Sequence, residues 1–278
     1  MTARRGLRGV DRGAHRAYAQ WERLRHGATL MADARSRLAY LRVERRRASG
    51  GPARVRVRPL DGAVFELRPG TTDAESLRDT FRDGVHPPPS EAVRRGVRQI
   101  VDLGSNIGAT VAHNALLHPE ARILGVELDP ATAELARRNI APWADRCKIL
   151  QGAVWTDDGI VHYDGVREDG FQVSSTAPAT GAAKSTRALS MNTVFGHLPP
   201  GARVDYLKMD IEGVEARLLS GAAAEWIERV DSISLQVHHP YTTADCERDL
   251  AALGFVTRLV PDRTNYIVGV RPDGAPES

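Results

Sequence analysis

The sequence has few cysteines, few aromatic residues and no long apolar run. Its 278 residues include two cysteines, Cys147 and Cys246, too few for a disulfide framework or a cysteine-rich zinc site. No segment approaches the roughly 18 consecutive apolar residues of a membrane span. The opening MTARRGLRGV carries basic residues without the apolar stretch of a secretory signal. We therefore expect a cytoplasmic protein with reduced thiols and no membrane contact.

Charge is distributed unevenly along the chain. Residues 1–60 contain 16 arginines and 4 acidic residues, a net charge of +12, whereas the whole chain carries +3 and the remainder therefore −9. Such a basic segment can bind nucleic acid, or it can dock on the acidic part of its own chain or of a second copy. Only 3 of the 38 basic residues are lysine, which is typical of a GC-rich genome and favours a bacterial source.

The basic segment also has a helical pattern, which favours docking over a free tail. Between residues 14 and 47, apolar residues recur at near-helical spacing, namely Trp21, Leu24, Leu30, Met31, Leu38 and Leu41. We expect one or two amphipathic helices here, with Gly27 as a break. The predicted domains are thus a helical segment at 1–60, which covers the active site or forms a homodimer contact, and a main domain at 61–278.

The start of the main domain predicts a hairpin and a helix. VRVRPL and AVFELRP read as two short strands around an Asp61-Gly62 turn. TTDAESLRDTF then begins like a helix capped by Thr72 or Asp73. The run Pro87-Pro88-Pro89-Ser90 marks a boundary.

Beyond this boundary, strands and helices alternate. Strand patterns such as RQIVDLG, RILGVEL and CKILQGAV are each followed by a helical or loop segment, and the alternation resumes through VDYLKMD and SISLQVHH. This order indicates an α/β fold with a parallel sheet and helices on both faces. The closing FVTRLVP and NYIVGVR suit antiparallel edge strands, and residues 156–185 suit an inserted hairpin with a mobile loop.

The ends of the first three strands carry residues suited to a nucleoside cofactor. VDLGSNIGAT allows a tight glycine turn close to a ligand, but Asn106 stands where the dinucleotide fingerprint requires glycine. Glu127 ends the second strand, 23 residues after Gly104, where a carboxylate can accept hydrogen bonds from both ribose hydroxyls. This arrangement favours S-adenosylmethionine, which has no pyrophosphate. The expected cofactor-binding residues are Asp102, Gly104, Ser105, Asn106, Gly108, Glu127, Leu128, Gly152, Ala153 and Asp210.

Through these motifs, the chain resembles the FkbM-type family of S-adenosylmethionine-dependent methyltransferases. The matching segments cover about residues 64–270, and the most specific is YLKMDIEGVEARLLSG, with its Lys-x-Asp-x-Glu-Gly-x-Glu pattern. The resemblance implies a class I methyltransferase (Rossmann-like) fold: a mostly parallel seven-stranded sheet with helices on both faces, here with an N-terminal helical and hairpin extension. It also implies methylation of a hydroxyl oxygen on a natural product or sugar. Asn192 and Gln236 stand where relatives commonly have acids, on the expected substrate side.

The charged residues at the end of the fourth strand are the candidate catalytic groups. Methyl transfer requires the acceptor oxygen in line with the methyl group and a base for its proton. Lys208 and Asp210 alternate onto one face of the strand and are expected to pair. We expect Asp210 or Glu212 to be the base, Lys208 to organise it, and His238 to act in catalysis or substrate binding.

Two alternatives remain open for this cluster. Lys208 and Asp210 could form a purely structural pair, with Glu212 and Glu215 solvated at a helix start, where the helix dipole favours acids. Asp210, Glu212 and His238 could also hold a divalent metal, although a metal is the less favoured reading.

Other functions fit the sequence less well. An RNA or other nucleic-acid methyltransferase could use the basic arm as its electrostatic footprint. However, aromatic residues make up only 5% of the chain, leaving few platforms for flipped bases, and the Asn-Pro-Pro-aromatic motif of base amino-methylases is absent. A non-catalytic cofactor-binding protein is the third option, which the intact strand-end motifs disfavour.

Overall fold

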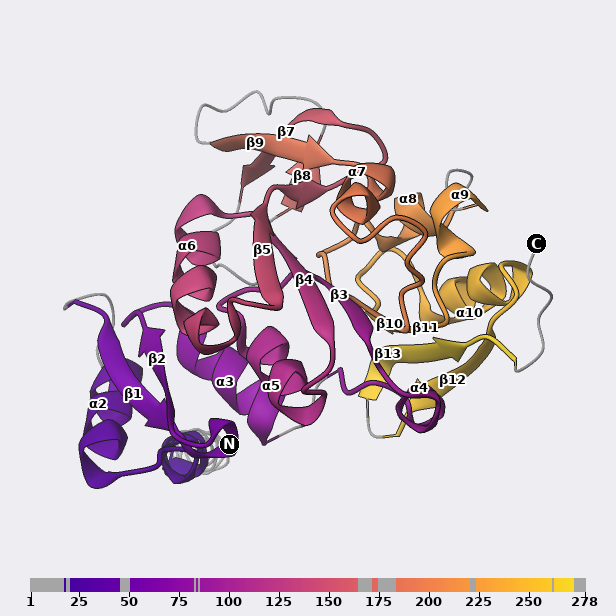
Figure 1. Ribbon diagram of the computed structural model, residues 1–278. Helices are drawn as coiled ribbons and strands as arrows, with labels where there is room; N and C mark the ends of the chain where they lie inside the picture. The colour runs from indigo at the N-terminus through magenta and orange to yellow at the C-terminus, as the bar shows by residue number, and fades with distance from the viewer. Residues whose placement is uncertain are drawn as a thin grey trace, which may run out of the picture. The chain divides into compact units, whose positions relative to one another are not determined.

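The structure is a computed structural model that describes residues 18, 21–45, 51–82, 84, 86–164, 172–174, 184–220, 224–261 and 263–272. The chain divides into two compact units, Met1–Asp83 and Gly84–Ser278 (Figure 1). The division falls later than the expected boundary at residue 60, because the hairpin and the helix after it belong to the first unit.

The first unit is a hairpin packed with helices. Strands β1 (Ala53–Val57) and β2 (Ala63–Leu67) pair antiparallel through a short 3-10 turn, η1 (Arg58–Leu60), with Asp61 in the left-handed conformation. This confirms the predicted hairpin. Helix α2 (Ala34–Arg45) packs on β1, and α3 (Asp73–Phe81) packs on α2. Thr72 is the N-cap of α3, but its side chain makes no capping hydrogen bond.

The helical prediction for the basic segment holds with two corrections. Residues 21–29 are helical and α2 follows, so the break lies at residues 30–33 rather than at Gly27. A Cβ at Gly27 would collide with the ring of Tyr40, so this glycine allows close packing instead. Trp21 and Leu38 are more than half exposed; the buried face of α2 includes Tyr40 and Val43. Residues 1–17 and 46–50, which hold much of the basic arm, lie outside the described residues.

A seven-stranded sheet forms the centre of the second unit. Its strand order is β12-β13-β11-β10-β3-β4-β5, and Figure 1 shows these strands crossing the unit. Strands β5, β4, β3, β10 and β11 are parallel, whereas β13 pairs antiparallel with β11 and with the edge strand β12. The bounds are β3 (Gln99–Leu103), β4 (Arg122–Glu127), β5 (Cys147–Gln151), β10 (Tyr206–Met209), β11 (Ser232–Gln236), β12 (Val256–Val260) and β13 (Arg263–Val270).

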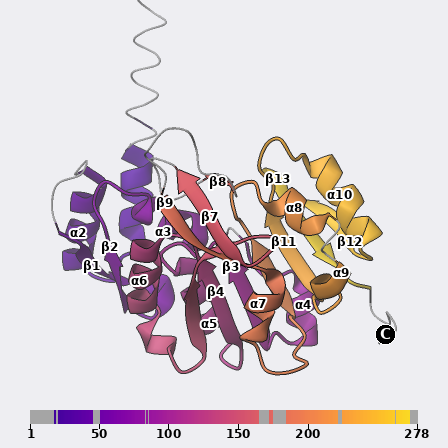
Figure 2. The ribbon, with the colours of Figure 1, turned by 90° about the horizontal axis from the view of Figure 1, so that it is seen from above.

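Helices cover both faces of this sheet. Successive side chains of a strand point to opposite faces, and every residue of β3 and β10 is buried, so both faces must be covered. Val101 and Leu103 of β3 belong to one large core cluster with apolar residues of α7 (Met191–Gly196), α8 (Glu215–Leu219), α9 (Ala224–Ile227) and α10 (Thr243–Ala252). The intervening Asp102 instead accepts a hydrogen bond from Thr110 of α5. Helices α5 (Ala109–Leu117) and α6 (Pro130–Asn139) pack together on β4, while α8 and α10 lie side by side (Figure 2). Two further short elements are α4 (Ser90–Arg95) and η2 (Ala141–Trp143).

A smaller four-stranded sheet, of order β6-β9-β7-β8, forms the predicted insertion. Its strands are β6 (Ala153–Val154), β7 (Gly159–Asp164), β8 (Gln172–Ser174) and β9 (Lys184–Leu189). The expected mobile loop falls largely on residues 165–171 and 175–183, outside the described residues. Within the described part of the chain, no helix combines the length and apolar character needed to cross a membrane. The predicted α/β architecture with its mostly parallel seven-stranded sheet is confirmed.

Candidate functional site at the ends of β3 and β10

The strand order of the large sheet reverses between β3 and β10. From β3 the chain continues through β4 and β5 on one side, and from β10 through β11 on the other. Ligands of open α/β sheets bind outside the carboxyl ends of the strands at such a switch point. The backbone N–H of Asp210 donates to the carbonyl of Leu103 at 3.1 Å, so the two strand ends meet directly.

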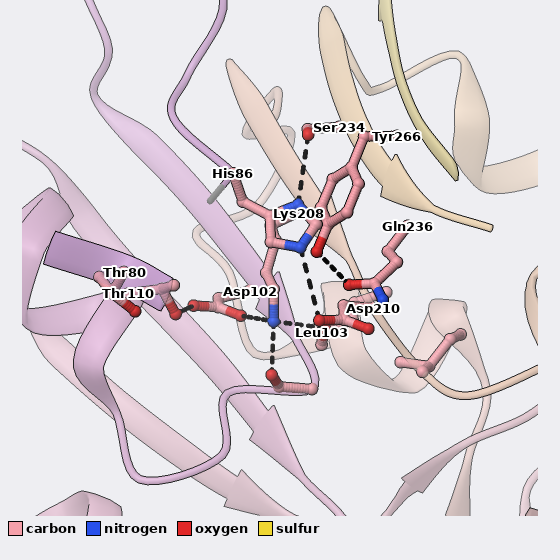
Figure 3. A network of polar contacts seen from close by, with 12 residues as sticks. Thr80, His86, Asp102, Leu103, Thr110, Lys208, Asp210, Ser234, Gln236 and Tyr266 are labelled. Atoms are coloured by element: carbon pink, nitrogen blue, oxygen red, sulfur yellow. Dashed lines mark hydrogen bonds and ion pairs between the residues drawn. The ribbon is translucent and has the colours of Figure 1, made fainter. Parts of the chain in front are cut away.

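Lys208 and Asp102 form a buried ion pair across these two strands. They lie opposite each other in the parallel register, with Nζ 3.1 Å from Oδ1, and are 4% and 1% exposed. The Lys208 ammonium also donates to the carbonyls of Leu103 at 3.3 Å and Gly104 at 2.5 Å, while the hydroxyl of Thr110 donates to the second oxygen of Asp102 (Figure 3). The ammonium therefore links the glycine turn to β10.

The expected attraction between Lys208 and Asp210 is present, but the direct ion-pair partner of Lys208 is Asp102. Residues two apart on a strand are about 6.6 Å apart, whereas residues opposite each other on neighbouring strands are about 4.8 Å apart, which brings Asp102 closer. Desolvation, the largest single effect, lowers the pKa of Lys208, but the negative charges of Asp102 and Asp210 outweigh it and raise the pKa above its ordinary value. Lys208 thus remains a cation inside the sheet.

Asp210 is held by a buried histidine that precedes the large sheet in sequence. Its Oδ2 lies 3.4 Å from Nε2 of His86, whose Nδ1 lies 3.3 Å from the hydroxyl of Ser234 on β11 (Figure 3). Burial lowers the pKa of His86, so its ring is neutral, with one donor and one acceptor nitrogen. Desolvation acts to raise the pKa of Asp210, but the His86 hydrogen bond and the Lys208 charge outweigh it and hold the pKa well below its usual range. Because ionised Asp210 can only accept, Nε2 carries the proton.

Gln236 and Tyr266 lie beside this histidine. The ring of Tyr266 on β13 packs against His86 at 4.8 Å between centroids, and its hydroxyl donates to the side-chain oxygen of Gln236. Gln236, one of the two departures from the family pattern, is thus anchored at the end of β11 (Figure 3).

His238 brings together the acids that follow β10. Its Nε2 lies 3.6 Å from Asp210 Oδ1 and 3.5 Å from Glu212 Oε2, and its Nδ1 lies 2.7 Å from Glu215 Oε1. Desolvation opposes the charged imidazole, but the three carboxylates outweigh it and raise the pKa of His238 to about 9. Three of the four predicted catalytic residues, Asp210, Glu212 and His238, are therefore in one cluster.

Glu215 differs from the structural interpretation, the one that assigned it an environment. Its side chain is fully buried and also accepts the N–H of Ile211 at 3.3 Å. The reading in which it is solvated at a helix start is therefore wrong. The left-handed backbone at Glu212, with φ +54°, turns the chain so that the short helix α8 points Glu215 back beneath His238.

The glycine turn after β3 is shaped for close backbone approach. Gly104 has φ +79°, and a Cβ there would collide with the carbonyl of Asp210. Gly108, with φ +82°, is the N-cap of α5, and a Cβ would come within 2.9 Å of Ile140. Between them, Asn106 has a buried side-chain oxygen with no hydrogen-bond partner among the described residues. The turn thus offers the amide oxygen of Asn106 as a hydrogen-bond acceptor, and its glycines let the backbone pass close to neighbouring groups. Both features fit a bound cofactor.

Glu127 ends β4 and holds this turn through both carboxylate oxygens. Oε2 accepts the N–H of Asn106 and Oε1 accepts the N–H of Asp129, each at 2.9 Å. Desolvation raises the pKa of Glu127 to about 7, against the opposing effect of these two hydrogen bonds. A buried carboxylate with spare lone pairs fits the ribose hydroxyls of S-adenosylmethionine.

The remaining predicted cofactor residues make hydrogen bonds within the chain or pack in its core. The Ser105 hydroxyl donates to the carbonyl of Asp102 at 2.8 Å, so its side chain stabilises the turn. Leu128 accepts the side-chain amide of Gln151 through its carbonyl at 2.9 Å. The N–H of Gly152 bonds the carbonyl of Glu127, and Ala153 is buried in the large core cluster. The carboxylate of Asp102 contacts Lys208 and Thr110, so its two oxygens already have partners within the chain.

Backbone strain is concentrated around these strand ends. Among the described residues, four non-glycine positions have positive φ, and three of them are His86, Asn106 and Glu212. Such conformations cost about 1–3 kcal/mol each and persist where the surrounding structure imposes them, often at functional sites.

Sequence reasoning missed His86, Ser234 and Tyr266. His86 precedes the proline run in a segment without periodicity, and the other two are ordinary strand residues. The contact between Glu215 and His238 was also not foreseen, although the sequence marks Glu215 as the final acid of the Lys-x-Asp-x-Glu-Gly-x-Glu pattern.

Comparison with known proteins agrees with this geometry. Residues 102–263 match the Methyltransferase FkbM domain. The O-methyltransferase imqG of Aspergillus flavus is 40% identical over 60 residues, 21% of this chain and 24% of that protein. A tRNA1(Val) (adenine(37)-N6)-methyltransferase of a Shewanella species is 28% identical over 156 residues, 50% of this chain and 64% of the relative. The chain thus covers less than two thirds of the length of these curated relatives.

Solved structures show weaker likeness. The amino pentose methyltransferase CalS10 from Micromonospora echinaspora, with S-adenosylmethionine bound, aligns with a TM-score of 0.40 and 13% identity over 71% of this chain and 97% of that one. The assignment therefore rests on the matched domain, which spans most of the described second unit and includes the glycine turn, Glu127 and the His238 cluster. The chain belongs to the FkbM family of S-adenosylmethionine-dependent methyltransferases.

Proposed function

We propose that this methyltransferase transfers the methyl group of S-adenosylmethionine to a hydroxyl oxygen of a small molecule, such as a natural product or sugar. The carrying observation is the cluster of Asp210, Glu212 and His238, whose mutual distances place acidic and imidazole groups together beside the glycine turn. The identity to an O-methyltransferase over 60 residues supports the same class of acceptor.

The chain's own residues suit three tasks in this reaction. Glu127 and the Gly104–Gly108 turn would hold the cofactor, whose sulfonium supplies the methyl group. Asp210, fixed by His86, and Glu212 would position the acceptor. S-adenosylmethionine would supply an electrophilic methyl group on its sulfonium, and the Asp210–Glu212–His238 cluster would take the proton that the acceptor hydroxyl gives up.

RNA is the alternative acceptor. A tRNA methyltransferase shares 28% identity over half of the chain, and residues 1–60 carry a net charge of +12. Against RNA, the end of β10 and the residue after it read Lys-Met-Asp, and the Asn-Pro-Pro-aromatic motif is absent from the sequence. Strong, salt-sensitive RNA binding by the full chain would favour this alternative.

The first test is calorimetric titration with S-adenosylhomocysteine, with NAD as the control ligand, followed by a screen of hydroxylated acceptors. We expect binding of the first ligand only. Asp210→Asn and Glu212→Gln should each retain this binding and lower turnover by about 10²–10⁴-fold, the usual contribution of a positioned base. Near-full turnover in both variants would remove the cluster from the chemistry.

A further inference from the structure

The geometry points to a divalent metal site: we propose that Asp210, Glu212 and His238 bind a hard cation such as Mg²⁺ or Mn²⁺. One ligand atom from each residue lies within 4.8 Å of the other two. His238 Nε2 is 3.6 Å from Asp210 Oδ1 and 3.5 Å from Glu212 Oε2. Ligand atoms about 2.1 Å from a shared cation lie about 3–4 Å from each other, so these separations fit an ion at their centre.

The orientation of His238 is an independent indication of metal binding. Its Nδ1 lies 2.7 Å from Oε1 of the fully buried Glu215. An Nδ1–H donated to this carboxylate leaves Nε2, the nitrogen that faces Asp210 and Glu212, as the ligating atom, and a bound cation takes the place of the proton that the carboxylates hold there. Nε2 is buried and has no hydrogen-bond partner among the described residues. Metal-ligating histidines almost always donate their other N–H to a carboxylate, carbonyl or water in this way.

Asp210 has a matching outer partner. Its Oδ1 faces His238, while its Oδ2 lies 3.4 Å from Nε2 of His86. His86 is buried and in turn contacts Ser234 at 3.3 Å. Ligating carboxylates are typically hydrogen-bonded through their second oxygen, so two of the three proposed ligands are held from behind by buried side chains.

The donor set selects the kind of cation. Two carboxylate oxygens and one imidazole nitrogen, without thiolate, suit Mg²⁺ or Mn²⁺ better than a soft metal. Three protein ligands leave positions of an octahedral ion open for water and for an acceptor oxygen. Both cysteines are buried and neither belongs to the group.

The role of the ion, though not its binding, rests on the proposed function. A cation that coordinates the acceptor hydroxyl lowers the pKa of that hydroxyl. Because the three side chains of the cluster then bind the ion, the proton passes to water and not to the cluster. The oxygen pair then forms the bond to the methyl carbon, and the carbon–sulfur pair remains on sulfur. The positive charge of the sulfonium is replaced by that of the released proton.

The test is titration of the full chain with Mn²⁺, followed by the paramagnetic resonance signal of free Mn²⁺. We expect one Mn²⁺ per chain. His238→Gln and Asp210→Asn should each lower the affinity by more than tenfold. His197→Gln and Glu120→Gln, which change exposed residues outside the cluster, should bind as the wild type does.

Glu215 tests the positioning argument separately. Glu215→Leu removes the Nδ1 partner and should lower Mn²⁺ affinity by about 10- to 100-fold, while Glu215→Gln, which keeps an acceptor, should lower it less. Wild-type affinity in Glu215→Leu would show that this residue does not orient a ligand.

Calorimetry with S-adenosylhomocysteine separates failure of the metal site from failure of the protein or of the proposed function. A chain that binds S-adenosylhomocysteine but no Mn²⁺ at millimolar concentration overturns the metal proposal alone, as does a His238→Gln variant with wild-type Mn²⁺ affinity. Full turnover after exhaustive chelation overturns the catalytic role of the ion. A chain that binds Mn²⁺ but not S-adenosylhomocysteine sustains the metal site and contradicts the proposed function.

Discussion

Buried charges at this site have different physical roles at different residues. Lys208 and Asp102 neutralise each other across two strands. Within the part of the chain that the structure describes, Glu127 forms no ion pair of this kind and is held by backbone N–H groups. An unpaired buried carboxylate is costly when ionised, so Glu127 is the group most open to stabilisation by a ligand that donates hydrogen bonds.

We predict that S-adenosylhomocysteine binds more tightly as pH rises from 5.5 to 8. The pKa of Glu127 is raised to about 7, chiefly by burial and in part by Asp129, with Lys208 acting in the opposite direction. Because the ionised form accepts both ribose hydroxyls, affinity should fall by up to about tenfold per pH unit below this pKa. Calorimetry across this range checks the slope. Glu127→Gln should bind weakly and without this slope, and an equally steep slope in the variant would assign it to another group.

The same shift affects stability, with the sign fixed by proton uptake. An acid whose pKa is raised in the folded state binds more protons folded than unfolded between pH 4.5 and about 7, so its contribution to the unfolding free energy falls as pH rises through this window. Relative to Glu127→Gln, the wild type should therefore lose on the order of 3 kcal/mol from pH 4.5 to 8. Urea unfolding at both pH values measures this change.

We also predict that Lys208→Met destabilises the protein by about 3–5 kcal/mol, because it leaves Asp102 as an uncompensated buried charge. The double variant Lys208→Met, Asp102→Asn should recover part of this loss. Denaturant unfolding of the two single variants and the double variant provides the measurement. If Asp102→Asn brought no recovery in the Lys208→Met background, the pair would not be the source of the effect.

At the scale of elements, the turn between β3 and α5 positions the site. Its glycines let the chain pass under the end of β10, where the ammonium of Lys208 binds the carbonyls of Leu103 and Gly104. The turn is also tied to β4 through Glu127. Three neighbouring strand ends are thus linked by the chain's own hydrogen bonds, and such preorganisation lowers the entropic cost of binding.

We predict that Gly104→Ala destabilises the protein more than Gly201→Ala does. Both glycines have positive φ, +79° and +71°, but a Cβ at Gly201 meets nothing within 4 Å, whereas at Gly104 it collides with the carbonyl of Asp210. Gly201→Ala should therefore show only the conformational cost, about 1–3 kcal/mol. Thermal unfolding and S-adenosylhomocysteine binding compare the two, and equal losses would argue against the close approach.

At the scale of the whole molecule, the proposed cofactor-binding and catalytic residues all belong to the second unit. The first unit has its own hairpin, helices and buried core, which includes Tyr40, Phe65 and Leu77. We propose that this unit covers the acceptor or joins two copies of the chain, since it holds the +12 segment of an otherwise acidic chain.

A chain that begins at Gly84 tests this division of roles. We expect it to fold, as judged by a cooperative thermal transition, and to bind S-adenosylhomocysteine with the affinity of the full chain. Turnover of the acceptor should fall sharply, because the acceptor would lose its cover or the dimer would separate. A fully active monomer without residues 1–83 would contradict both roles of the first unit.

The sequence by itself determined the alternation of strands and helices, the hairpin around Asp61-Gly62 and the placing of Glu127 at a strand end. These depend on local periodicity, turn chemistry and the spacing of neighbouring elements, which a single chain displays directly. The Lys-x-Asp-x-Glu-Gly-x-Glu pattern also located the cluster at the end of β10.

Only the tertiary structure decided which of these groups meet. Lys208 pairs with Asp102, which lies 106 positions earlier in the chain, because register between β3 and β10 sets that distance. Glu215 contacts His238 because the left-handed turn at Glu212 directs the chain back toward it. His86 contacts Asp210 although the two lie far apart in the sequence. Periodicity identifies the face of an element on which a side chain lies, but its partner depends on how the strands are ordered in the sheet.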